Sequence, residues 1–268
     1  MRHFVFKGFN ILCASAILIV TSCSKDDNTR YDSSVRGDLT VEFDNIAGAA
    51  DLQLNTGEYT NSSGEKFTVT ELKYYVSNFS LERTDGTEYV VPQDSCYFLI
   101  DESDPSTHEP VLSVPEGEYK SLSFTIGVDS LRSTMDFSKR TGVLDTTANG
   151  GDMYWDLNRG YIFFNLEGSS ATASTDGTYK YHIGGFGGYT SPTFNNIKKV
   201  TMDLTQRGTP KVKAGKETNI HLMVDVLKFF SGEPILSIAT NPVVMFDDIS
   251  VHLADKLPGM FEHDHTEN

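Results

Sequence analysis

Two histidines near the C-terminus have the spacing of a metal-binding pair. His263 and His265 form the segment HDH within the acidic sequence MFEHDHTEN. In an extended chain the side chains of residues i and i+2 lie on one face, so we expect these two imidazoles to reach one ion. Neutral imidazole is a ligand that suits copper and zinc. The alternative interpretation is a disordered polar tail, which would bury little surface.

His182 is a third histidine whose position indicates a ligand. It follows the sequence YKY and precedes the glycine run GGFGG at 184–188. We expect a strand that ends there, with His182 facing away from its apolar neighbours, where a ligand could approach. Taken alone, such a residue is more often an ordinary surface histidine. His221 also lies off the apolar face of its segment, but the sequence assigns no role to it or to His108.

Trp155 is the only tryptophan in the chain and lies in the segment GDMYWDLNRGYIFFNLEG. One interpretation is that its indole fills the core, because a buried tryptophan contributes a large apolar area and needs one hydrogen-bond partner. The other is that Trp155 lies beside the metal-binding histidines and either shields the metal or is chemically modified. The residue types alone favour the core.

The elements that position these residues are strands. Strict alternation of apolar and polar residues predicts half-buried antiparallel strands at 121–128, 200–206 and 219–226. In LKYYVSNFSL the apolar parity shifts, which predicts a bulge near Ser77 and Asn78. Helical spacing is scarce, with one short helix expected in FDDISVHLADKL and one turn in VLKFFSG.

This pattern predicts an all-β chain. We expect one antiparallel β-sandwich over residues 38–268, with one or two short helices near the C-terminus. A division into two domains is the alternative. Cys96 is expected to be a small core residue rather than a nucleophile.

The N-terminus has the features of a lipoprotein signal. Two basic residues precede a short apolar run that ends in VTSC, and small residues before a cysteine are typical of bacterial lipoproteins. We expect residues 1–22 to be a signal peptide and Cys23 to be lipidated, which would anchor the protein stably. A membrane helix or a secreted protein is the alternative.

Residues 23–37 are expected to form an acidic linker. Lys25, Asp26 and Asp27 follow the cysteine and resemble the surface-export signal of Bacteroidetes lipoproteins. This resemblance implies a protein on the outer membrane that faces outward.

The charge of the chain excludes nucleic acid as a partner. The net charge is −15, and removal of residues 1–22 takes away two of the 22 basic residues and none of the 37 acidic ones, which leaves −17. Such a surface repels nucleic acid. The sequence also contains no G-x-S-x-G, H-E-x-x-H, phosphate-binding loop or paired C-x-x-C, so we do not expect an enzyme.

Six segments in order resemble the MbnP-like family, over roughly residues 38–265. They are ELKYYVSNFSL, YFLID, GEYKSLSFTIGVDS, MYWDLNRGYIFFNLEG, YHIGG and MFEHDH. The resemblance implies a β-sandwich that binds copper, whose partner is a di-haem, peroxidase-like MbnH that converts a tryptophan beside the metal to kynurenine.

The resemblance also implies roles for individual residues. His182, His263 and His265 match histidine-bearing segments of the family and would be the metal ligands. Trp155 matches the first tryptophan of the family's segment and would lie beside the metal, either modified or not. Many members have a second aromatic residue two positions later, where this chain has Leu157.

Two functions follow from these observations. The first is a surface-anchored lipoprotein that binds copper, or zinc, through histidines near a tryptophan, in metal acquisition or buffering. The second is a lipid-anchored binding or adhesion module without a metal, with glycans as the candidate ligand. Exposed aromatic platforms would favour the second, and the sequence offers Tyr74, Tyr75, Tyr154, Tyr179, Tyr181 and Tyr189 for them.

Overall fold

The computed structural model describes residues 1, 3, 31–148 and 151–268. The predicted lipid-attachment residue Cys23 and the export residues Lys25, Asp26 and Asp27 lie outside the described residues, as does nearly all of the predicted signal peptide. Tyr31–Asn268 form one compact unit. In the part of the chain that is described, no helix is long and apolar enough to span a membrane.

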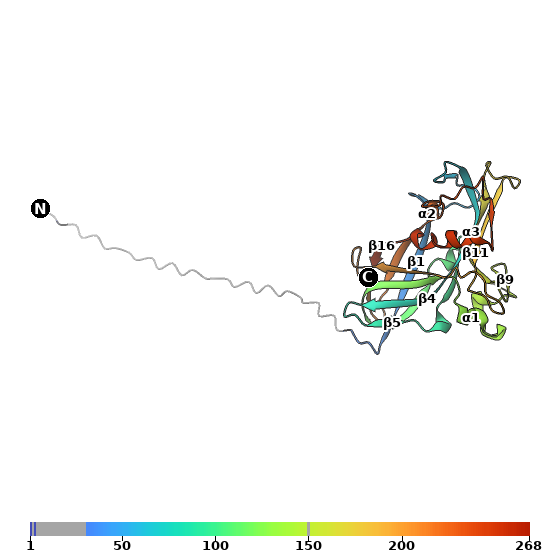
Figure 1. Cartoon of the computed structure of the whole chain (residues 1–268). Coiled ribbons are helices and arrows are strands. Elements are labelled where there is room, and N and C mark those ends of the chain that lie inside the picture. The colour runs from blue at the N-terminus through green and yellow to red at the C-terminus, as the bar shows by residue number, and fades with distance from the viewer. Residues whose placement is uncertain (2, 4–30, 149–150) are drawn as a thin grey trace. The chain divides into compact units, whose positions relative to one another are not determined.

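Two sheets make up this unit (Figure 1). The smaller sheet has the order β16 (Phe261–Glu267), β14 (Asn219–Asp225), β1 (Arg36–Ala47) and β2 (Ala50–Asp51), and β7 (Val111–Pro115) also pairs with β1. The larger sheet has the order β12 (Lys198–Asp203), β8 (Gly117–Ile126), β4 (Lys66–Arg83), β10 (Gly160–Ser169), β11 (Thr178–Gly184) and β15 (Val243–Val244). Five short strands extend it, namely β3 (Tyr59–Thr60), β5 (Glu88–Val90), β6 (Tyr97–Asp101), β9 (Tyr154–Asp156) and β13 (Lys211–Val212).

The core lies between the two sheets. Phe43 on β1 and Phe261 at the start of β16 contact Phe124 on β8 edge-on, with ring centroids 5.7 and 5.3 Å apart. Alternate residues of β1 and of β14 are buried, and for β14 the periodicity of residues 219–226 predicts this. The predicted all-β sandwich is therefore confirmed, and Cys96 is a buried free thiol in this core.

Several local predictions are also confirmed. The register of β4 against β8 shifts between Ser77 and Ser80, and Asn78 has a φ of 51°, which places a bulge at the predicted position. The expected helices are α2 (Val226–Phe230) and α3 (Asp248–Ala254). The structure adds α1 (Ser130–Thr134) and the 3₁₀ turns Gln93–Ser95, Pro105–Thr107, Phe137–Lys139, Gly142–Leu144 and Leu257–Met260.

Two strand pairs are parallel, whereas the sequence pattern indicated antiparallel strands throughout. β1 pairs with β14 in parallel over seven positions, and β11 pairs with β15 in parallel over two. Alternation shows which face of a strand is buried, but it carries no information on the direction of the neighbouring strand. The parallel register places Glu42 of β1 beside His221 of β14.

The outer face of the larger sheet is covered in part by the chain between β8 and β10. Val128, Leu144 and Met153 of this segment pack on Tyr161 and Phe163 of β10 and form a second apolar cluster. We call this group, together with Tyr75, Ile162, Phe186 and the partly buried side chains that pack on them, the satellite cluster.

Candidate metal centre

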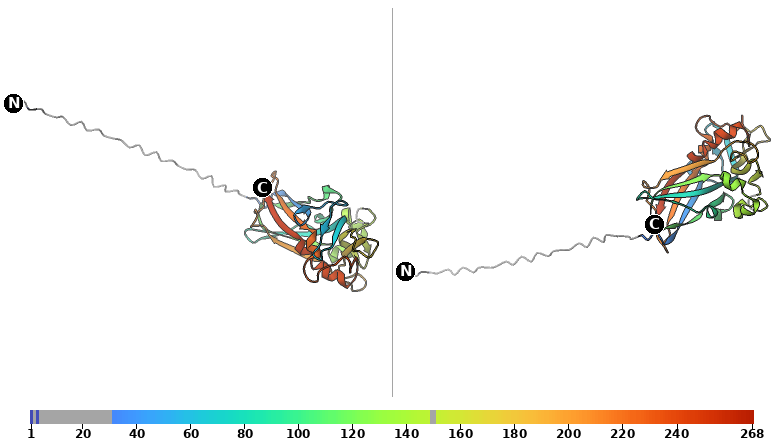
Figure 2. Two further views of the ribbon diagram at one scale, coloured as in Figure 1. Left: turned by 90° about the horizontal axis from the view of Figure 1, so that it is seen from above. Right: turned by 60° about the horizontal axis from the view of Figure 1, so that its bottom comes forward.

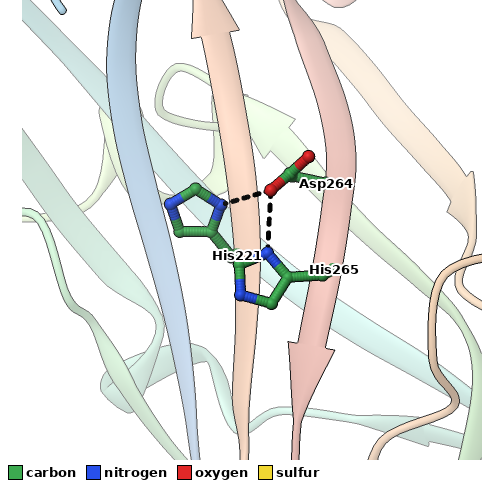
Figure 3. Close-up of side chains that lie close together, drawn as sticks. All are labelled: His221, Asp264 and His265. Atoms are coloured by element: carbon green, nitrogen blue, oxygen red, sulfur yellow. Dashed lines mark hydrogen bonds and ion pairs between the residues drawn. The ribbon is translucent and has the colours of Figure 1, made fainter.

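A bulge in the last strand brings two histidines and an aspartate together. In the antiparallel pair of β14 and β16, His221 is opposite His265 and Leu222 is opposite His263, so Asp264 is the extra residue of β16. Such a bulge turns the strand locally. As a result Asp264 and His265 both lie beside His221, on the outer face of the smaller sheet (Figure 3).

The three side chains meet at one carboxylate oxygen. Oδ2 of Asp264 lies 2.8 Å from Nδ1 of His265 and 3.4 Å from Nδ1 of His221. The two imidazole rings are tilted by 35° with centroids 4.8 Å apart. The His221 side chain is 16% exposed and that of His265 is 45% exposed, so solvent reaches the group from the side of His265.

His263 is not part of this group. It is 6% exposed, on the inner face with Leu222, and its Nε2 lies 2.9 Å from the hydroxyl of Thr266. The expectation that His263 and His265 share one face is wrong, because that expectation holds for a regular strand and the bulge at Asp264 reverses the alternation. The alternative interpretation, a disordered tail, does not hold, since these residues form β16.

Further acidic side chains surround the group. Nε2 of His221 lies 3.6 Å from Oδ2 of Asp44 and 3.8 Å from Oε1 of Glu42, both on β1. Nε2 of His265 lies 3.6 Å from a carboxylate oxygen of Glu267. On the other side, a guanidinium nitrogen of Arg207 lies 3.6 Å from Asp264. Carboxylates therefore outnumber cations around the two imidazoles.

The ionisation of the group follows from these contacts. The hydrogen bond with His265 lowers the pKa of Asp264 below its ordinary value, and the same bond raises the pKa of His265. Burial raises the pKa of Asp44, with a further contribution from the neighbouring acids. Burial lowers the pKa of His263, which favours its neutral form.

Two imidazoles and one carboxylate form a donor set that suits copper, zinc and related ions. Among the described residues this is the one group of three such side chains whose ligand atoms all lie within 4.8 Å of one another. In a tetrahedral site, ligand atoms at about 2.0–2.1 Å from a zinc ion are roughly 3.4 Å apart. To bind one ion, the widest separation would need to close by at most about 1.4 Å, and the 2.8 Å contact between Asp264 and His265 would need to open.

His182 lies on the larger sheet, in β11, and is outside this group. Its Nε2 is 2.7 Å from a carboxylate oxygen of Glu167, which also pairs with Lys180 at 3.1 Å. Its position opposite to its apolar neighbours is as expected, but the residue is 9% exposed rather than accessible. The structure therefore does not bring His182 together with His265.

Trp155 is part of the packing around the satellite cluster. The indole meets Phe246 edge-on at 5.2 Å, and the guanidinium of Arg159 lies 5.5 Å from its ring. A Cβ at Gly184 would come within 3.0 Å of the indole, so the glycine permits this close contact. Among the described residues, Nε1 of Trp155 has no hydrogen-bond partner. These packing contacts support the interpretation that the indole of Trp155 fills the core.

The residues expected to form an aromatic platform are mostly buried. Tyr74, Tyr75, Tyr179 and Tyr181 are at most 1% exposed, and Tyr189 is 53% exposed.

His108 lies near Glu102, with its Nε2 3.7 Å from the carboxylate. His221 and Asp264 were not predicted from the sequence as members of the site, and the position of His221 off the apolar face was the available signal.

Comparison with known proteins shows similarity to one family. The family model described as MbnP matches residues 36–246. Among solved structures, MbnP from Methylosinus trichosporium is similar, with 17% identity and a TM-score of 0.53, over 76% of this chain and 83% of that one. At this identity the likeness concerns the fold. No curated protein matches the sequence. The family match includes His221 but ends before Asp264 and His265.

Proposed function

Because the chain belongs to the MbnP family, we propose that it is a surface-anchored lipoprotein that binds copper at His221, Asp264 and His265. The observation that carries this proposal is the convergence of two imidazoles and a carboxylate on the outer face of the smaller sheet. Zinc is the second ion that suits this donor set.

The chain's own residues account for binding and release. Each imidazole must be deprotonated at the ligating nitrogen, so an arriving cation displaces the proton that His265 shares with Asp264. Asp264 supplies a negative charge that offsets the charge of the ion. The partial exposure of His265 leaves a path for the ion, which suits a protein that acquires or buffers metal.

The proposal differs from the sequence expectation in its ligands, since His182 and His263 are outside the group, and Trp155 is not among its residues either. A di-haem MbnH-like partner that modifies Trp155 remains a prediction of the resemblance. Its test is mass spectrometry of the protein from its native host, where conversion of the indole to kynurenine would change the mass of the peptide that contains Trp155.

Equilibrium dialysis with copper and with zinc tests the proposed function. We expect wild-type protein to bind one ion, and His221→Ala and His265→Ala to lose most of the affinity. His252→Ala is the matched control, because His252 is an exposed histidine on α3 outside the group. Equal binding by wild type and by both site variants would refute the proposed site.

The anchor is tested separately. We expect Cys23→Ala to abolish acylation, and replacement of Lys25, Asp26 and Asp27 by alanine to keep the lipid but turn the protein inward. Protease added to intact cells should then digest the wild type and spare the second variant. Equal digestion of both forms would contradict surface export.

A further inference from the structure

The two nitrogens of His221 face different surroundings. Nδ1 points toward Asp264 and His265, is buried, and has no hydrogen-bond partner among the described residues (Figure 3). Nε2 points in the other direction, toward β1, where Asp44 and Glu42 lie 3.6 and 3.8 Å away. A neutral imidazole carries a proton on one nitrogen and a lone pair on the other. The location of that proton therefore decides which nitrogen can bind an ion.

We propose that Asp44 and Glu42 are positioning residues that hold the proton of His221 on Nε2, so that Nδ1 presents its lone pair to the metal. This inference rests on the proposed function and adds the atom through which His221 binds and the side chains that select it.

Electrostatics favours this proton position. With the proton on Nε2, the ring directs an N–H at two carboxylates, which is attractive. With the proton on Nδ1, the ring would direct its N–H at Asp264 alone, and the Nε2 lone pair would face the other two carboxylates, which is repulsive. With the proton on Nε2, the lone pair of Nδ1 faces Oδ2 of Asp264 at 3.4 Å. Two such acceptors repel each other, but a cation bound between them is attracted to both.

The fold makes the positions of the two acids reproducible. Glu42 is opposite His221 in the parallel register of β1 and β14, and Asp44 is two residues further along β1 on the same outer face. The side-chain amide of Asn219 donates a hydrogen bond to Glu42 at 2.5 Å, which fixes that carboxylate. The gaps to Nε2 exceed a direct hydrogen bond, so a small side-chain rotation or a bridging water completes the contact.

Carboxylates that accept a hydrogen bond from the non-ligating nitrogen of a metal-binding histidine have a measurable effect on metal affinity. Such partners fix the tautomer and raise the basicity of the ligand, and their loss costs about 10- to 100-fold in metal affinity. The test uses the double variant Asp44→Asn, Glu42→Gln, which retains side-chain size. Its matched control is Asp38→Asn, Glu217→Gln, which removes the same charge from exposed residues near the same face.

Zinc alone is the probe, and affinity is measured by competition with a chelator. We expect the double variant to bind zinc about 10- to 100-fold more weakly than the control variant. Nitrogen-15 NMR of the imidazoles gives the second readout. In metal-free wild type at a pH where His221 is neutral, we expect the proton on Nε2, and in the zinc-loaded protein we expect ligation through Nδ1.

The outcomes separate this inference from the proposed function. If His221→Ala abolishes zinc binding but the double variant equals its control, the positioning role is refuted and the site stands. A proton on Nδ1 of His221 in metal-free protein, or ligation through Nε2, also refutes it. If neither zinc nor copper binds to the wild type, the proposed function fails together with this inference.

Discussion

The outer faces of the two sheets differ in kind, and His265 and Trp155, which the sequence indicated for one site, lie on different sheets. On the smaller sheet His221 and His265 are surrounded by carboxylates and partly open to solvent. On the larger sheet Trp155 is packed against Phe246 and Arg159. Figures 1 and 2 place β9, with Trp155, at the end of the sheets away from the C-terminus. Ligands and tryptophan thus have separate surroundings, which allows each to be tested without the other.

The largest expected effect comes from removal of the last strand. Deletion of residues 262–268 removes five paired positions of β16 along β14 and the buried side chain of His263. At about 0.5–1.5 kcal/mol net for each hydrogen bond, we expect unfolding to become easier by roughly 3–6 kcal/mol. Urea unfolding measures this loss. A truncated protein with an unchanged midpoint would show that the segment is a dispensable tail, as its polarity had indicated.

The contrast between β16 and the other strands shows what sequence can predict here. Residues 121–128 and 219–226 alternate strictly, so their buried faces could be predicted. The segment EHDHTEN has no apolar alternation that would fix a register, and its bulge at Asp264 arises from pairing with β14. The same long-range pairing sets His221 opposite His265, across 44 positions of sequence that local patterns do not connect.

Loss of the indole is expected to have the next largest effect. Trp155→Ala should lower the free energy of unfolding by about 3 kcal/mol, the lower end for such a change because Trp155 is only partly buried. Copper affinity should stay the same, since Trp155 is outside the histidine group. Trp155→Phe should retain more of the stability. A Trp155→Ala protein that is stable but has lost copper affinity would show that Trp155 and the histidine group belong to one site.

Substitution of single histidines shows which of the two sheets carries the metal site. We expect His221→Ala or His265→Ala to weaken copper binding at least 10-fold, which is about 1.4 kcal/mol, with little change in stability on an outer face. His182→Ala should leave affinity unchanged, because His182 pairs with Glu167 on the other sheet. Dialysis and urea unfolding on the same samples separate the two effects. The reverse pattern, with His182 required and His221 dispensable, would show that the metal site lies on the larger sheet.

The smallest expected effect is a difference in titration between two neighbours in β16. Contact with Asp264 raises the pKa of His265 above its ordinary 6.5, and burial lowers the pKa of His263 below it. The raised pKa means that His265 stabilises the fold below pH 6.5 and that this contribution is lost as the pH rises through the folded pKa. The lowered pKa of His263 has the opposite sign, so its protonation weakens the fold as the pH falls.

NMR titration of metal-free protein resolves the two rings, and Asp264→Asn should return the midpoint of His265 toward 6.5 while His263 stays below it. Because a proton competes with the ion for His265, copper affinity should begin to fall at a pH above 6.5 as the solution is acidified. Identical midpoints for both histidines would mean that the bulge does not place them in different surroundings. The outer face of the smaller sheet would then lack the carboxylate-bound histidine that distinguishes it from the packed outer face of the larger sheet.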